Sequence, residues 1–295
     1  MNPISKPQVS IVVASHNARA SIEECLSAIV AQRGPDNVEI IVVDNSTDGT
    51  TEVIQKRFPH IKLFVEPPAA LIPNLWGAGI RQSTGDIVAI TTAHFIPDKK
   101  WFFHILKVHR ALLVAVGGAI ENDGSARVVD WAVYFCRYSP YMLPFQGGFV
   151  SEIAGDNASY KRRYIDQCRH VWSDGFWENT VHAQLKKAGF RLLLAPSIVV
   201  HHKRSFGFRN FMRQRFLHGI QFGRTRASRF SLPKRTLYMM LSPAIPFIFL
   251  ARIARQVVTK QRHQTKFLQA LPVLVLFLSA WTLGELVGYV RGPVR

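Results

Sequence analysis

The sequence predicts an α/β protein in which a mainly parallel sheet is flanked by helices and followed by a C-terminal helical, membrane-associated region. Two observations predict the sheet: short β-branched runs alternate with amphipathic segments, and several of these runs end in polar residues. A third observation predicts the last region, because basic and aromatic residues after position 200 lead into long apolar runs. With 295 residues, 48% of them hydrophobic, the chain can bury at least one full core.

Strand and helix signals alternate along the first part of the chain. Buried strands are predicted where apolar β-branched residues run together, and helices where polar caps precede amphipathic segments. The predicted strands are Val9–Ala14, Val38–Val43, Ile61–Val65, Ile87–Ile90 and Val114–Ile120, and the predicted helices are Ser21–Gln32, Thr51–Phe58, Leu75–Ser83, one that begins at Trp101, and Val128–Tyr138. This alternation implies right-handed crossovers and hence neighbouring strands that run parallel.

Polar side chains stand where the first two strands end. Ser15, His16 and Asn17 follow the first strand, and Asp44 ends the second. In open α/β sheets, ligands bind outside the carboxyl ends of the strands. An aspartate at such an end can accept a hydrogen bond from a base N–H or a ribose hydroxyl, so Asp44 is predicted to contact a nucleotide. Asp48 is predicted to cap the helix that follows.

A second polar region runs from Gly155 to His202. It begins with the turn Gly155–Asp156–Asn157, continues with Glu178 after two aromatic residues, and closes on two histidines at the end of an apolar strand. Asp156 is expected to shape its turn. A small polar turn, a carboxylate and terminal histidines together indicate a polar pocket.

The formal net charge of +18 and the isoelectric point near 10.3 predict a polyanionic partner. The positive charge is densest after residue 200, where phenylalanines are interleaved with the basic residues and apolar runs follow. This composition favours an anionic membrane surface, and nucleic acid is not expected as a partner. The basic residues of this segment are Lys203, Arg204, Arg209, Arg213, Arg215, Arg224, Arg226, Arg229, Lys234 and Arg235.

Cysteine usage and the N-terminal residues bear on the compartment. Cys25, Cys136 and Cys168 are too few and too scattered for a disulfide framework or a zinc site, so reduced thiols are expected. Residues 1–8 lack the apolar segment of a signal peptide, so the N-terminal part is expected in the cytoplasm.

Two apolar runs follow the basic segment. Leu237–Ala251 is short and is interrupted by Pro243 and Pro246, which suits an in-plane or re-entrant helix. Phe267–Val290 is long enough to cross a bilayer once, or it lies shallow in the interface, and Glu285 inside it needs a partner. The basic connector between the runs is expected to stay cytoplasmic, which disfavours a two-span hairpin but leaves it open.

The ordered set of motifs resembles the family 2 inverting glycosyltransferases of the GT-A fold, which is Rossmann-like. The resemblance covers about residues 9–205. The segments that carry it are Val9–Asn17, Ile40–Thr50, Gly85–Pro97, Gly155–Arg162, Glu178, Ala188–Phe190 and Pro196–His202.

The resemblance implies a role for each matching position. Glu178 would be the catalytic base, with Trp177 standing where the family has the first acid of a Glu-Asp pair, and Asp174 is the alternative base. The residues that would bind the nucleotide are Ala14, Ser15, His16, Asn17, Asp44 and Thr92, and those that would contact the acceptor or donor sugar are Gly155, Asp156 and Asn157.

The sequence departs from the family at its metal motif. The acidic Asp-x-Asp should lie at residues 92–94, where no carboxylate is present. A divalent cation, manganese or magnesium, that bridges diphosphate oxygens prefers oxygen ligands. Because no carboxylate oxygen is available at residues 92–94, the candidate metal ligands are His94 and His202. Their ring nitrogens would suit a softer ion. Alternatively, cations would neutralise the leaving diphosphate directly, the candidates being Arg81, Lys161 and Arg162.

These patterns predict three parts: residues 1–205 as the GT-A glycosyltransferase domain, 206–235 as a basic interfacial helical segment, and 236–295 as membrane-associated or transmembrane helices. The predicted function is transfer of a sugar, with inversion, from a nucleotide sugar to a lipid-linked or polysaccharide acceptor. The catalytic domain is expected to face the cytoplasm at the cell inner membrane. The alternative is a non-catalytic scaffold that binds a sugar nucleotide or lipid in a polysaccharide assembly complex.

Overall fold

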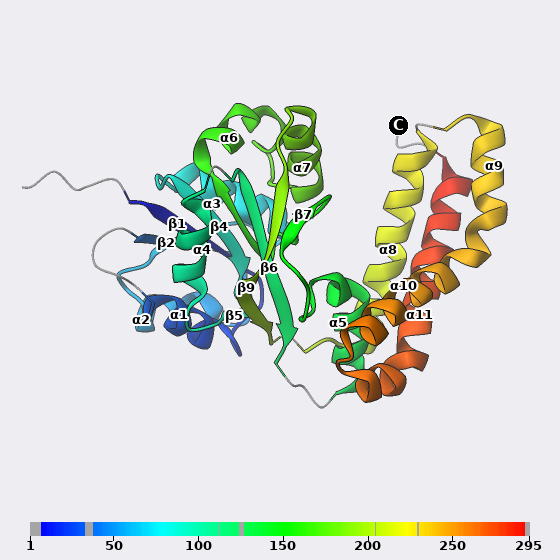
Figure 1. The fold of residues 1–295 in the computed structure, drawn as a ribbon, viewed down its shortest axis with the longest axis horizontal. Coiled ribbons are helices and arrows are strands. Elements are labelled where there is room, and N and C mark those ends of the chain that lie inside the picture. The colour runs from blue at the N-terminus through cyan, green and yellow to red at the C-terminus, as the bar shows by residue number, and fades with distance from the viewer. Residues whose placement is uncertain are drawn as a thin grey trace, which may run out of the picture. The chain divides into compact units, whose positions relative to one another are not determined.

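The computed structural model describes residues 7–32, 38–111, 113–123, 127–203, 205–228 and 230–292. Residues 1–6, Arg204 and Arg229, which entered the sequence predictions, lie outside these ranges. The chain forms two compact units: residues 1–123 with 143–204, and residues 124–142 with 205–295. The first unit is α/β and the second is helical, and each is described by itself (Figure 1).

One nine-stranded sheet forms the centre of the α/β unit. Its path is β3-β2-β1-β4-β8-β6-β9-β5, and β7 pairs with β9 off this path. The strands are β1 (Val9–Ser15), β2 (Val38–Asp44), β3 (Lys62–Val65), β4 (Ile87–Thr92), β5 (Phe95–Pro97), β6 (Ala115–Asn122), β7 (Gly148–Val150), β8 (Asn157–Lys161) and β9 (Leu192–His202). The predicted strands are all present, with ends shifted by one or two residues.

Several strands end at the same edge of the sheet because they run in the same direction. β1, β2, β3, β4, β6 and β9 run the same way, whereas β5, β7 and β8 run opposite. The sheet is therefore mixed, with a parallel majority. Because β8 is antiparallel to β4, its first residue, Asn157, pairs with Thr91 and lies at the edge where β4 ends. The turn before β8 and the ends of β1, β2 and β4 consequently meet at this carboxyl edge.

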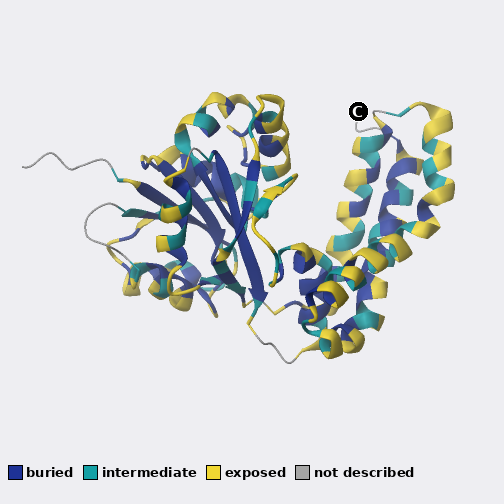
Figure 2. Ribbon diagram, viewed as in Figure 1, coloured by how far each residue is buried: buried dark blue, intermediate teal, exposed yellow. Residues whose placement is uncertain are grey.

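Helices cover the sheet and leave its central strands buried, whereas β3 and β7 are partly exposed (Figure 2). Every residue of β1 and β4 is buried, as expected for central strands rich in Val and Ile. The helices of this unit are α1 (Ile22–Val30), α2 (Thr50–Arg57), α3 (Ile72–Gln82), α4 (Trp101–His109), α6 (Arg162–Gln167) and α7 (Glu178–Lys187), with the 3-10 turn η2 (Arg169–Val171). α3 packs on β1 and β2, and α4 packs on β6 and β9.

The helical unit contains α5 (Val128–Tyr138), α8 (Phe208–Ala227), α9 (Leu232–Leu241), α10 (Ile245–Lys260) and α11 (Gln264–Arg291), with the 3-10 turns η1 (Ser139–Tyr141) and η3 (Ser242–Ala244). α8 and α11 approach until their backbones touch. A Cβ atom added to Gly219 would lie 2.2 Å from the carbonyl oxygen of Trp281, and one added to Gly284 would lie 2.1 Å from that of Phe216. Gly223 and Gly288 repeat this contact one turn further along, so both helices use a small-x-x-x-small pattern.

The predicted helix at 128–138 is present, but it belongs to the helical unit. Its aromatic side chains pack on the start of α11, with Trp131 beside His263 and Phe135 edge-on to Phe267. The second part of this unit begins at residue 205, and the division into three parts stays a prediction. Residues 206–235 and 236–295 fall within one compact unit.

Among the described residues, two helical segments are long and apolar enough to cross a membrane: Leu232–Lys260 and Gln264–Arg291. The first is divided by η3 at Pro243, where the sequence indicated an interruption. The partner required for Glu285 is present. Its Oε1 accepts hydrogen bonds from Arg226 Nη1 at 3.1 Å and from Tyr289 OH at 2.7 Å.

Candidate functional site

The residues predicted to bind a nucleotide meet at the carboxyl edge of the sheet. Ser15 pairs with Asp44 across β1 and β2, and Ala14 pairs with Thr92 across β1 and β4. Three adjacent strands therefore end side by side. Parallel strands expose the N–H and C=O groups of the following loops at this edge, which suits the binding of a polar ligand.

The loops after β1 and β2 are joined by side-chain hydrogen bonds. The backbone N–H of Asn17 donates to Ser46 Oγ at 2.8 Å, and Asn17 Oδ1 accepts from the N–H of Thr47 at 2.9 Å. His16 Nδ1 lies 2.8 Å from Asn45 Oδ1. Asn17 has a φ of 49°, a left-handed conformation that asparagine tolerates better than most residues. These bonds hold the two loops in one arrangement.

Asp44 lies beneath these loops. Its side chain is fully buried, and its two carboxylate oxygens accept hydrogen bonds of 2.5 Å from Ser46 Oγ and Thr51 Oγ1. It thereby organises the loop between β2 and α2. Asp48 binds the start of α2, as predicted, because its Oδ1 accepts from the N–H of Thr50 at 3.2 Å.

Glu178 lies against the turn that precedes β8. A Cβ atom built on Gly155 would be 3.4 Å from the carboxyl carbon of Glu178 and 2.8 Å from Cη2 of Trp76. Trp76 donates through Nε1 to the carbonyl oxygen of Thr91 at 2.7 Å, which ties it to the end of β4. The fold therefore brings the predicted base to the carboxyl edge. Glu178 is half-buried and is the first residue of α7, where a negatively charged side chain is favourable.

Two sets of contacts position α7. In front of it, the N–H of Phe176 donates to the carbonyl of Pro73 at 2.7 Å, so the start of α3 holds the preceding loop. Within α7, the buried ring of His182 lies between Tyr160 OH at 2.9 Å and Glu152 Oε2 at 2.7 Å. Burial lowers the pKa of His182, and its hydrogen bond with Glu152 acts in the opposite direction.

The other two residues of the turn differ in their surroundings. Asp156 is half-buried, and its carbonyl accepts from Thr91 Oγ1 at 2.8 Å. Asn157 is only 1% exposed, and its amide is bound by Trp101 Nε1 at 2.9 Å and by the carbonyls of Ala119 and Ile198. Asn157 therefore holds β8 between its neighbours, while Gly155 and Asp156 present the turn beside Glu178.

The two histidines predicted as metal ligands are brought together across β5 and β9. Phe95 pairs with His202, and the N–H of Lys203 donates to the carbonyl of His94 at 2.8 Å. The ring of His94 is already engaged, with Nδ1 3.1 Å from Ser21 Oγ and Nε2 3.3 Å from the carbonyl of His16. His202 is 3% exposed and packs on the Phe95 ring at a centroid distance of 5.0 Å.

These residues do not fit a divalent cation held by the protein. In the ranges that the structure describes, no three His, Cys, Asp or Glu side chains gather as a metal site. Residues 92–94 contribute no carboxylate, and the nitrogens of His94 have neighbours of their own. A hard cation prefers oxygen ligands. We therefore derive no step through a metal ion.

The alternative prediction, that a cation neutralises the diphosphate, is wrong for Lys161 and Arg162 and stays a prediction for Arg81. Lys161 pairs with Ile87 at the beginning of β4, about 17 Å from the carboxyl edge at ~3.3 Å per residue. Arg162 donates to the carbonyl of Gly85, and Arg81 donates to that of Ser173. The sequence motif placed these cations next to the turn, but β8 carries Lys161 and Arg162 across the sheet.

Sequence reasoning missed Trp76, which supports the turn, and the hydrogen bonds that the buried residues Tyr160 and His182 form with each other and with the exposed Glu152. Trp76 carries no local signal, because its role depends on contact with Thr91 and Gly155. The spacing of Glu178 and His182, four residues apart at the start of a helix, could have placed both on one face of α7.

Comparisons with known proteins agree with this geometry. Residues 10–169 match the sequence profile described as Glycosyl transferase family 2. The dolichyl N-acetyl-alpha-D-glucosaminyl phosphate 3-beta-D-2,3-diacetamido-2,3-dideoxy-beta-D-glucuronosyltransferase of Methanococcus voltae is 25% identical over 323 aligned positions, which cover 96% of this chain and 98% of that protein. The probable glycosyltransferase YdaM of Bacillus subtilis (strain 168) is 30% identical over 235 positions, covering 71% of this chain and 54% of YdaM.

Solved structures confirm the GT-A fold. The mannosyltransferase PcManGT from Pyrobaculum calidifontis, solved in complex with GDP-Man and Mn²⁺, has a TM-score of 0.60 and 21% identity. That match covers 95% of this chain and 87% of PcManGT. S. aureus TarS 1–349 matches with a TM-score of 0.51 and 12% identity over 93% of this chain and 91% of TarS. At these identities the likeness carries the fold alone.

Proposed function

The chain belongs to glycosyl transferase family 2, and on that basis we propose that it transfers a sugar, with inversion, from a nucleotide sugar to a lipid-linked acceptor at a membrane. The nucleotide would lie along the ends of β1 and β2, over the joined loops that contain Asn17 and Asp44. The sugar would lie over the end of β4, beside Gly155 and Asp156. Three strand spacings of about 4.8 Å separate β2 from β8, which leaves room for an extended ligand.

One observation carries the catalytic part of the proposal: the carboxyl group of Glu178 adjoins the Gly155 turn at this edge. A base must lie within hydrogen-bond reach of the proton that it removes. A carboxylate at the start of a helix, half-buried beside a sugar site, meets that requirement. The contacts that hold the loop before α7 to α3, and those of His182 within α7, limit how far Glu178 can move.

The proposed reaction is a single displacement. A hydroxyl oxygen of the acceptor attacks the anomeric carbon, and the bond from that carbon to the diphosphate oxygen breaks with inversion of configuration. Glu178 takes the hydroxyl proton, and the diphosphate leaves with the bonding electron pair as part of the nucleotide. Negative charge grows on the diphosphate as it leaves, so the polar N–H groups at the carboxyl edge would favour departure.

Membrane association and a lipid-linked acceptor are supported by two observations. The Methanococcus voltae relative is named for a dolichyl phosphate-linked sugar, and two helical segments of this chain are long and apolar enough to cross a membrane. Basic residues cluster around the connector between α10 and α11, which favours a cytoplasmic position for that connector. We extend this to an inner-membrane enzyme with a cytoplasmic catalytic domain.

The decisive experiment compares the full chain with Glu178→Gln and Asp174→Asn. Loss of the base should lower the transfer rate by about 10²–10⁴-fold while donor binding is kept. Asp174→Asn should retain activity, because only the backbone carbonyl of Asp174 is used in the site, as acceptor for Asn74 Nδ2. Equal rates in wild type and Glu178→Gln would remove Glu178 from the base role. Donor binding without transfer to any acceptor would favour the scaffold function.

A further inference from the structure

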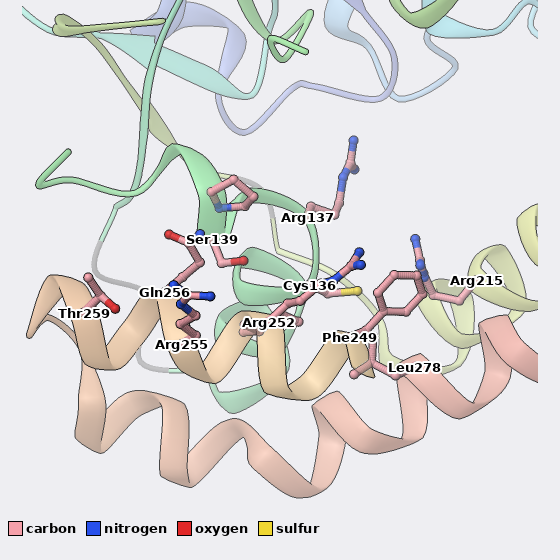
Figure 3. Close-up of a pocket in the computed structure, with 12 residues that line it drawn as sticks. Cys136, Arg137, Ser139, Arg215, Phe249, Arg252, Arg255, Gln256, Thr259 and Leu278 are labelled. Carbon is pink, nitrogen blue, oxygen red and sulfur yellow. The ribbon is translucent and has the colours of Figure 1, made fainter. Parts of the chain in front are cut away.

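A cavity of about 610 Å³ lies inside the helical unit, formed by α5, η1, α8, α10 and α11 (Figure 3). Its volume falls in the ~300–1,000 Å³ range of small-molecule sites. Apolar side chains, among them Phe249, Ile253 and Leu278, form much of its wall. All of the residues that line it belong to this unit, so the cavity is defined without reference to the α/β unit.

Four arginines from three helices line the cavity: Arg137, Arg215, Arg252 and Arg255. Figure 3 shows Arg252 and Arg215 on either side of Cys136 and Phe249, and Arg255 near Gln256. None of the twelve lining residues is an aspartate or glutamate. Within the described residues, Arg215, Arg252 and Arg255 form no ion pair with a carboxylate. Arg252 and Arg255 are exposed at the mouth of the cavity, whereas Arg215 is half-buried, so the positive charge of the cavity is available to an anion that enters it.

Among these arginines, Arg215 is the one with a buried hydrogen-bond donor that an anion could accept from. Its Nε is buried and has no hydrogen-bond partner in the described part of the chain, and its guanidinium lies 4.3 Å from the centroid of the Trp281 ring. Burial lowers the pKa of Arg215. Burial also lowers the pKa of His218, and the charges of Arg215 and Arg137 lower it further, so the field of these arginines reaches beyond the cavity.

The two helices α9 and α10 expose large apolar side chains, and α10 also lines the cavity. On α10, Phe247 is 72% exposed and Val258 is 64% exposed, and only 11% of the most apolar window of Leu232–Lys260 is buried. α9 adds Leu232 and Met240, each more than 70% exposed. Exposed apolar surface of this extent indicates contact with lipid. If this apolar surface lies in lipid, an anion that reaches the cavity from the lipid would be the head group of a molecule with an apolar chain.

We infer that this cavity binds the phosphate head group of an anionic lipid, with the arginines on the phosphate oxygens and the lipid chains along the exposed apolar side of α10. Guanidinium groups bind phosphate oxygens bidentately, and four arginines line this one cavity. The apolar side chains beside Arg215 would strengthen its contact with a phosphate oxygen, because a hydrogen bond is stronger where the local dielectric is low. The site is independent of sugar transfer, because no residue of the α/β unit takes part.

The test measures binding to the purified full chain in an uncharged detergent. The ligands are dioctanoyl phosphatidate, dioctanoyl phosphatidylcholine and inorganic phosphate, titrated without a sugar donor. The variant is Arg252→Gln with Arg255→Gln, two exposed residues whose replacement should leave the fold intact. The matched control is Arg209→Gln with Arg213→Gln, which removes the same charge from exposed positions of α8 outside the cavity. Arg215→Gln tests the buried member.

Wild type and control should bind phosphatidate alike, and each arginine removed from the cavity should weaken that binding about tenfold. Phosphatidylcholine and inorganic phosphate should bind much more weakly, because one lacks a free phosphate monoester and the other lacks chains. An equal loss in the control would reduce the effect to surface charge and overturn the site. If inorganic phosphate binds as tightly as phosphatidate, the ligand of the cavity is a free phosphate and the proposal of a lipid is overturned. Failure of sugar transfer would leave this measurement unaffected.

Discussion

Gly155 and Glu178 lie in contact: a Cβ atom on Gly155 would stand 3.4 Å from the carboxyl carbon of Glu178. The same atom would stand 2.8 Å and 2.9 Å from two carbons of the Trp76 ring. The ring cannot easily withdraw, since its Nε1 donates to Thr91 at the end of β4. Glycine is therefore the residue that allows the turn, the ring and the carboxylate to share this corner.

Gly155→Ala should lower both stability and transfer. The added methyl group comes closer to Trp76 than real Cβ atoms do, so the ring or the turn must move and Glu178 with it. Overpacking of this kind costs about 1–3 kcal/mol of folding free energy. Thermal unfolding and initial transfer rates would measure the two effects.

The control for that variant is Gly148→Ala, because a Cβ atom on Gly148 would meet no atom within 4 Å. It should leave the transfer rate unchanged. If Gly155→Ala transfers sugar at the wild-type rate, the contact between Gly155, Trp76 and Glu178 does not position the reacting groups.

His94→Ala tests whether His94 binds a metal or supports the loops. Its ring joins Ser21 to the carbonyl of His16, so removal should cost about 1–3 kcal/mol by leaving a buried polar group without its partner. The response of the transfer rate to added Mn²⁺ should be the same as in wild type. A changed Mn²⁺ dependence would instead restore the role that the sequence predicted for His94. Unfolding curves and manganese titrations separate the outcomes.

Glu285→Leu should destabilise the helical unit by about 3 kcal/mol, because Arg226 and Tyr289 both donate to that carboxylate between α8 and α11. The double variant Arg226→Met with Glu285→Leu should recover much of the loss, since it leaves no charge without a partner. Thermal unfolding in detergent measures both. If the double variant is as unstable as Glu285→Leu, the loss does not come from leaving Arg226 without its carboxylate partner.

Glu39 should contribute to stability in an acid-dependent way. Burial raises the pKa of its carboxyl group, but hydrogen bonds from Ser10, Lys62 and Thr84 outweigh burial and lower the pKa from 4.5 to about 2. The folded state therefore binds fewer protons than the unfolded state. The contribution is fully present above pH 4.5 and is lost as the pH falls towards about 2.

The matching variant is Glu39→Gln. Its stability deficit relative to wild type should shrink by roughly 2 kcal/mol across that window, after allowance for solvent screening. Denaturant unfolding at a series of pH values measures the deficit. A constant deficit would mean that the carboxylate has an ordinary pKa in the folded protein.

The fold could be predicted from sequence wherever the signal is local. Runs such as Val9–Ala14 specify buried strands because every side chain must be apolar there, and the helix at 128–138 was found from its pattern. Which unit that helix joins was not predictable, because Trp131 and Phe135 find their partners more than a hundred residues away. The reversed direction of β8 was also missed, and with it the true position of Lys161.

Local pattern was enough to identify an α/β chain with polar strand ends, a basic segment and apolar helices, because burial and periodicity act over a few neighbouring residues. It also singled out Glu178. What surrounds that carboxylate came only from the folded chain: Glu178 and Trp76 both lie against Gly155, and Trp76 is bound to the end of β4. The arginine-lined cavity arose in the same way, since side chains from three helices converge only after those helices pack.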